Sequence, residues 1–95
     1  MSLRDGDTPL IDAAQRGDRA ALARLLAEGA DPGASNDFGN TALMLAAARG
    51  DLEMVERLVA AGARPGQANK WGLTAQDWAK WPANAADVIA RLTTK

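Results

Sequence analysis

Apolar residues along this chain fall into short groups that have the spacing of helix faces. Leucine and valine recur at i, i+3 and i+4, which places their side chains on one side of a helix. The same positions return 33 residues later, as Leu22 with Val55, Leu25 with Leu58 and Leu26 with Val59. The pattern predicts short amphipathic helices that each bury one apolar face.

The 33-residue interval extends over the whole chain. It relates three glycines, three threonines and three alanines: Gly6, Gly39 and Gly72; Thr8, Thr41 and Thr74; Ala13, Ala46 and Ala79. Self-similarity at a fixed interval is the signature of stacked repeats, in which each unit covers the apolar face of its neighbour. Helices of two or three turns are unstable alone in water, so the units are expected to fold together.

Each unit carries the capping residues of two short helices. The repeated threonine can cap a first helix by accepting a hydrogen bond from one of its free N–H groups. That helix is expected to stop at Gly17 and Gly50, because glycine adopts the left-handed conformation of a helix C-terminus. Asp18 and Asp51 then cap a second helix, which is expected to end at the next glycine.

The start of each predicted first helix resembles the ankyrin signature T-P-L-H-x-A. The segments are Thr-Pro-Leu-Ile-Asp-Ala at 8–13, Thr-Ala-Leu-Met-Leu-Ala at 41–46 and Thr-Ala-Gln-Asp-Trp-Ala at 74–79. The resemblance implies an all-α ankyrin-repeat solenoid of three helix-turn-helix units with projecting β-turn fingers. It also implies that the chain binds a protein partner through its concave face and finger tips.

We expect one domain over residues 1–95, with repeats at about 3–35, 36–68 and 69–95. The outer repeats are expected to be caps, because a terminal repeat needs a polar outer face. Asp12 and Arg19 replace leucines of the middle unit and are expected to look toward a preceding repeat. Polar residues on the opposite face of the third unit are Gln76, Lys80 and Arg91. This arrangement favours a free-standing protein over a piece of a longer array.

The sequence departs from the signature at its histidine, which is Ile11, Met44 and Asp77 here. The hydrogen bonds that this histidine makes in the family are therefore expected to be lost, with packing in their place. Met44 is expected in the core, as is Trp78, which aligns with Leu45.

The third unit is the least regular. Ala83 stands where the first two units have a glycine, and residues 81–85 leave room for one extra residue before the second helix. Whether Val88 or Ile89 faces inward stays open.

Composition narrows the possible functions. The chain has no cysteine and no histidine, which removes thiolate nucleophiles, the usual general base and the commonest metal ligands. Asp5, Asp7 and Asp12 are the remaining candidates for acid–base chemistry, but they fall on an exposed cap, where their pKa values would not be pushed apart. We expect no enzyme activity, no metal and no cofactor.

The charge pattern bears on partners. The 11 basic and 12 acidic residues are interspersed and give a net charge of −1, so no basic stripe is available for nucleic acid or a membrane surface. No apolar run approaches the roughly 20 residues of a membrane span. A cytoplasmic protein is expected.

The variable positions around the repeated glycine and late in the first helix are the candidate partner-binding residues. They are Asp37, Phe38, Asn40, Arg49, Lys70, Trp71, Leu73 and Trp81. Buried tryptophan is a favoured anchor of interfaces, but an aromatic residue at this position can also simply pack against the next finger. Trp71, Leu73 and Trp81 are expected to form an apolar patch. A monomer is favoured over a homo-oligomer, and self-association through these aromatics is the main alternative function.

Overall fold

The computed structural model describes residues 8–93, which form six helices and no strand. The helices are α1 (Pro9–Arg16), α2 (Arg19–Ala27), α3 (Ala42–Arg49), α4 (Leu52–Ala60), α5 (Ala75–Trp78) and α6 (Ala85–Thr93). Ser35 and Thr41 form an isolated antiparallel bridge. The expectation of an all-α solenoid is confirmed.

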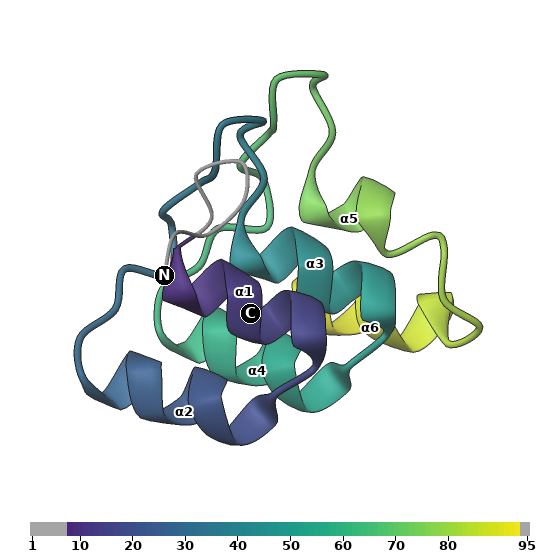
Figure 1. Cartoon of the computed structure of the whole chain (residues 1–95). Coiled ribbons are helices and arrows are strands. Elements are labelled where there is room, and N and C mark those ends of the chain that lie inside the picture. Colours follow the sequence, from purple (N-terminus) through teal and green to yellow (C-terminus); the bar gives the residue numbers. More distant parts are fainter. Residues whose placement is uncertain (1–7, 94–95) are drawn as a thin grey trace.

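The helices form two layers. In the inner layer α3 packs between α1 and α5, and in the outer layer α4 packs between α2 and α6. Each unit is a helix pair, α1 with α2, α3 with α4 and α5 with α6. The segments that precede α3 and α5 rise from the helical layers on the same side (Figure 1). This is the arrangement of stacked repeats that cover one another.

The predicted capping residues begin the helices. Thr8 Oγ1 accepts from the Ile11 N–H at 3.2 Å, and the Asp18 carboxylate accepts from the Ala21 N–H at 3.0 Å. The equivalent threonine and aspartate of the second unit make the same bonds. Each bond satisfies one of the free donors of a first helical turn.

The helices end near the repeated glycines. Gly17 and Gly50 have φ of 71° and 73° and directly follow α1 and α3, as the sequence predicts. The second helices end slightly earlier than predicted, at Ala27 and Ala60, and the chain reaches the positive φ of the next glycine two residues later.

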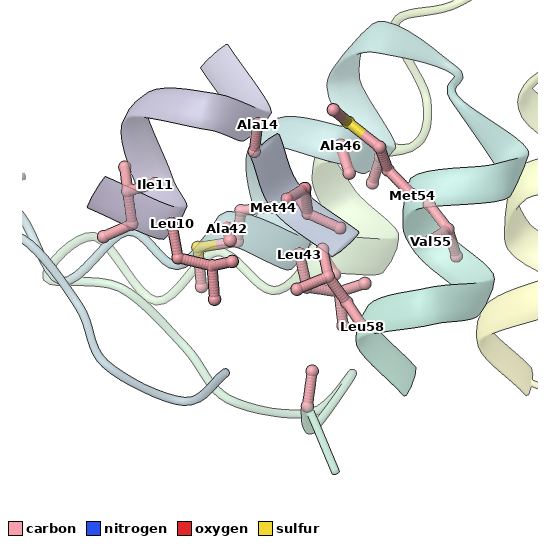
Figure 2. Close-up of a cluster of buried hydrophobic side chains, with 14 of the residues drawn as sticks. Leu10, Ile11, Ala14, Ala42, Leu43, Met44, Ala46, Met54, Val55 and Leu58 are labelled. Atoms are coloured by element: carbon pink, nitrogen blue, oxygen red, sulfur yellow. The ribbon is translucent and has the colours of Figure 1, made fainter. Parts of the chain in front are cut away.

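The core lies between the two layers and between successive units. Figure 2 shows its larger side chains gathered between α1, α3 and α4. Alanines fill the space between the inner helices and are fully buried: Ala13 and Ala14 of α1, and Ala46 and Ala47 of α3. Met44 is buried as expected. Trp78 is only half-buried, although it packs against the core, and its Nε1–H is buried without an acceptor.

The third unit keeps the interval of the others. α6 begins at Ala85, which is 33 residues after the first residue of α4, so residues 81–85 hold no extra residue. Val88 is fully buried and Ile89 only half-buried, which settles the register. α5 is the irregular element, with four residues against eight in α3. An eight-residue helix would include Pro82, whose ring would collide with the carbonyl of Trp78.

The residues at the signature histidine position behave differently in each unit. Ile11 is fully buried and replaces the histidine by packing, as expected. In the second unit the Thr41 N–H donates to Met44 Sδ at 3.4 Å. In the third, the backbone N–H and hydroxyl of Thr74 donate to Asp77 Oδ2 at 2.8 and 3.2 Å. The expectation that packing replaces every hydrogen bond is therefore wrong, because an aspartate can also accept them.

The polar residues of the outer units are also informative. The Arg19 Nε–H donates to both carboxylate oxygens of Asp51, at 3.1 and 3.0 Å, and this hydrogen bonding raises the pKa of Arg19. The expectation that Arg19 looks away from the second unit is wrong, because this aspartate lies beside it in the next repeat. Gln76, Lys80 and Arg91 are exposed, but Arg91 Nη1 lies 2.6 Å from Glu56 Oε1 of α4. The expectation that Arg91 looks away from the second unit is therefore wrong as well.

Candidate functional site

Two β-turn fingers stand above the inner helices (Figure 1). The second finger is defined as residues 35–41 and the third finger as residues 68–74. In the second, the Gly39 N–H donates to the Asn36 carbonyl at 3.0 Å, so Asp37 and Phe38 are the central residues of the turn. Lys70 and Trp71 have the same place in the third finger, where the equivalent bond is also 3.0 Å.

An asparagine shapes each turn. Asn36 Oδ1 accepts from the backbone N–H groups of Phe38 and Asn40, both at 3.0 Å. Asn69 Oδ1 accepts from the two equivalent groups of the third finger at 2.9 and 3.0 Å. An asparagine side chain that bonds the backbone two residues on is a known device of turns. These two asparagines are not among the candidates predicted from the sequence, although their 33-residue spacing and their place three residues before a repeated glycine identify them.

The two fingers are fastened together. The Asn69 side-chain amide donates to Asn40 Oδ1 at 2.8 Å, and the Lys70 N–H donates to the Phe38 carbonyl at 3.0 Å. Asn69 is only 7% exposed. At Gly39 a Cβ atom would lie 3.0 Å from the Asn69 Cα, so the backbones meet where only glycine fits. The fingers therefore form one platform.

The platform carries an exposed aromatic pair. The rings of Phe38 and Trp71 are stacked, with centroids 5.7 Å apart and planes inclined at 26°. Phe38 is 37% exposed, Trp71 65% and the neighbouring Leu73 42%. The stacking shows that these aromatics pack against each other, yet most of the indole of Trp71 remains open to solvent.

Opposite charges flank the pair. Asp37 and Lys70 are both exposed and occupy equivalent places in the two turns, each directly before an aromatic residue. The two turns therefore present the same layout, a charged residue followed by an aromatic one, with the sign of the charge reversed.

Two of the sequence candidates lie outside the platform. Arg49 is the last residue of α3, and its Nη1–H donates to the carbonyl of Gln15 at 3.2 Å, so its guanidinium lies against the C-terminus of α1. Trp81 follows α5 and is 78% exposed. Among residues 8–93 the one stacked ring pair is that of the fingers. The structure thus brings Trp71 to Phe38, whereas Trp81 follows α5 in the chain and makes no ring contact with either of them.

Only one of the three acidic candidates for catalysis lies among the described residues. Asp5 and Asp7 lie outside them, and Asp12 pairs with Arg16 at 2.8 Å. Within the described part of the chain, no group of three or more acidic, histidine or cysteine side chains could hold a metal ion. None of the helices there is long and apolar enough to cross a membrane.

Comparison with known proteins agrees with the repeat architecture. A family model described as ankyrin repeats in three copies matches residues 10–93. The search of curated proteins gave no match. Ankyrin repeats are generally protein–protein interaction modules and are typically non-catalytic. Because the match extends over most of the sequence, this chain belongs to the ankyrin-repeat family.

Proposed function

We propose that this chain is a recognition module whose protein partner docks on the tips of the second and third fingers. The observation that carries the proposal is the aromatic pair, because Trp71 is 65% exposed although its ring is held against Phe38. Tryptophan is enriched among the residues that dominate binding energy at interfaces. An ordered but exposed indole is therefore the best anchor on the described surface.

The platform supports this function because it is preorganised. The buried amide of Asn69 bonds both its own turn and Asn40 of the neighbouring finger, so the tips need little ordering when a partner arrives. Side-chain and loop ordering at an interface costs about 0.5–1.5 kcal/mol for each immobilised side chain, and a rigid tip avoids part of that cost.

The aromatic pair alone is too small for a stable complex. The exposed parts of Phe38, Trp71 and Leu73 amount to roughly 300 Å², given about 150–250 Å² for a whole aromatic side chain. A specific interface buries about 800 Å² on each partner. The partner must therefore reach beyond the tips, and the inner helices below them are the adjacent surface.

The proposed contact set keeps the candidates from the sequence, with different roles. Asp37 and Lys70 supply charges at the tips. Asn40 and Arg49 already make bonds within the chain, so they contribute through shape and through their remaining donors and acceptors. Trp81, which follows α5 in the chain and is exposed, adds a further apolar contact. The complete set is Asp37, Phe38, Asn40, Arg49, Lys70, Trp71, Leu73 and Trp81.

We further propose that the protein is non-catalytic and cytoplasmic. It is also expected to need no cofactor and to have no affinity for nucleic acid. The formal net charge of −1 supports the last point, because nucleic-acid binding draws most of its affinity from cationic side chains. A gel shift at low salt tests it, and cell fractionation tests the location.

Affinity capture from the source cells tests the proposed site. Wild type is compared with Phe38→Ala/Trp71→Ala, and with Glu28→Ala as the control at an exposed residue outside the contact set. The double variant is expected to lose partners that wild type and Glu28→Ala both retain. Circular dichroism checks that each variant is folded. If a folded double variant recovers the same partners as wild type, the finger tips are not the site.

A further inference from the structure

The two finger tips are complementary to each other in charge and alike in shape. Asp37 and Phe38 form the tip of the second finger, and Lys70 and Trp71 occupy the equivalent places in the third. The fingers project from the same side of the molecule and are joined by the hydrogen bond from the Lys70 N–H to the Phe38 carbonyl (Figure 1). The surface formed by the two tips therefore carries opposite charges at its two ends, so it can match the same surface of a second copy in charge.

We infer that this platform binds a second copy of the chain, tip to tip, in a twofold symmetric dimer. The inference rests on the proposed function, because it uses the same protein-binding surface and names one of its partners. In a twofold interface both subunits use the same surface patch. If one residue of the first copy contacts a given residue of the second, the same contact occurs again with the two copies exchanged.

The charges select one orientation of the symmetry axis. Consider a twofold axis that is perpendicular both to the direction in which the fingers project and to the line that joins them. This axis places the second finger of one copy against the third finger of the other. The tip that carries Asp37 then lies opposite the tip of the second copy that carries Lys70, and this pairing occurs twice. An axis along the line that joins the fingers places each finger against its own copy, so that the two acidic tips oppose each other, as do the two basic tips.

The size of the patch makes this dimer weak. The apolar area of roughly 300 Å² on each copy lies well below the 800 Å² or so of a stable interface. The dissociation constant is therefore expected in the range of about 0.1–1 mM, with the chain monomeric at micromolar concentration. Because both complexes use the same tips, a tighter partner protein displaces the second copy.

Sedimentation velocity over a range of concentrations up to about 1 mM tests the inference on the wild-type chain. Reversible dimerisation is expected, and it weakens as salt is added. Trp71→Ala is expected to abolish it. Gln76→Ala, a substitution of an exposed residue outside the finger tips, is expected to leave it unchanged.

Charge exchange tests the orientation. Asp37→Lys and Lys70→Asp each place like charges opposite one another twice, so each variant alone is expected to dimerise at least about tenfold more weakly. An equal mixture of the two restores opposite charges in both pairs and is expected to dimerise like wild type. All these positions are exposed, and circular dichroism confirms that the variants are folded.

A wild-type chain that stays monomeric at about 1 mM, or a dimer that both charge variants retain, overturns the inference. Capture of a partner protein by such a monomeric chain leaves the proposed function intact. Conversely, the double aromatic variant could recover every partner protein, which would refute the proposed function. A dimer with the expected charge pattern would still support the inference, so one experiment can refute either proposal without refuting the other.

Discussion

The side-chain amide of Asn69 donates a hydrogen bond to Oδ1 of Asn40 at 2.8 Å, and this bond ties the third finger to the second. The same buried side chain accepts two backbone N–H groups of its own turn. Asn69→Ala is therefore expected to lower the free energy of unfolding by about 2–3 kcal/mol, because two half-buried backbone donors lose their acceptor and the bond to Asn40 is also lost. Urea denaturation measures the change.

Asn69→Asp separates the two roles of this residue. The carboxylate keeps an acceptor for the two backbone N–H groups but has no N–H to donate to Asn40. Its cost is expected to exceed about 1 kcal/mol, because two acceptor oxygens then face each other at the former bond. A variant as stable as wild type would show that the bond between the fingers contributes nothing.

The close approach of the fingers at Gly39 gives a second prediction. Gly39 and Gly72 occupy equivalent turn positions with φ of 79° and 77°, so alanine meets the same backbone strain at both, roughly 1–2 kcal/mol. A Cβ at Gly39 would also lie 3.0 Å from backbone atoms of Asn69 and Lys70, whereas a Cβ at Gly72 would meet nothing within 4 Å. Gly39→Ala is expected to cost at least about 1 kcal/mol more than Gly72→Ala.

Gly72→Ala serves as the matched control for that comparison, because it introduces the strain without the collision. Urea denaturation of both variants gives the difference directly. If the two substitutions lower the free energy of unfolding equally, the second finger can shift away from the third without any loss of stability. That result would contradict the finding that the two fingers form one platform.

The unpartnered Nε1–H of Trp78 gives a third prediction. A buried donor without an acceptor costs about 1–3 kcal/mol, and Trp78→Phe removes it together with part of the ring. The two effects oppose each other, so the free energy of unfolding is expected to change by less than about 1 kcal/mol. Trp78→Ala, which removes the whole ring from the core edge, is expected to cost about 2 kcal/mol or more. A phenylalanine variant as unstable as the alanine variant would contradict this account.

Stability at acidic pH depends on Asp77. The hydrogen bonds from Thr74, first that of its backbone N–H, lower the pKa of Asp77 against the opposing effect of burial, and Lys80 adds to the lowering. A carboxyl whose pKa is lower in the folded chain contributes stability above its unfolded pKa, near 3.9 for aspartate, and loses that contribution as pH falls through its folded pKa.

The expected observation is a pH-dependent difference between wild type and Asp77→Asn. The asparagine keeps an acceptor oxygen for Thr74 but carries no charge. The melting temperature of the variant is expected to lie below that of wild type at pH 6, and the gap is expected to close as pH falls below about 4. A gap that stays constant down to the lowest pH would assign the effect of the substitution to geometry rather than to ionisation.

The 33-residue interval predicts most of the fold because the residues that set it act locally. Thr8 and Asp18 cap their own helices, and Gly17 ends one, so each can be identified without knowledge of the rest of the chain. The shortness of α5 also has a local cause, because Pro82 cannot lie inside a helix that continues through Trp78.

Contacts between units could not be predicted in the same way. Two such bonds run from Arg19 to Asp51 and from Arg49 to the carbonyl of Gln15 in α1. The bonded residues are 32 and 34 positions apart in the sequence. These bonds depend on the distance and the angle between one repeat and the next. Neither quantity can be obtained from the composition or the periodicity of the sequence. The stacking of Phe38 on Trp71 is partly of this kind: the sequence offers packing against the next finger as one of two possibilities, and only the distance between the fingers decides between them.

Site-specific photo-crosslinking tests whether partner proteins dock on the finger tips. A photoreactive amino acid is placed either at Lys70 on the third finger or at Glu28, an exposed residue after α2, and the cells are irradiated. The chain labelled at position 70 is expected to form covalent adducts with a partner protein, and the chain labelled at position 28 is expected to form none. Adducts from position 28 alone, or equal adducts from both positions, would contradict it.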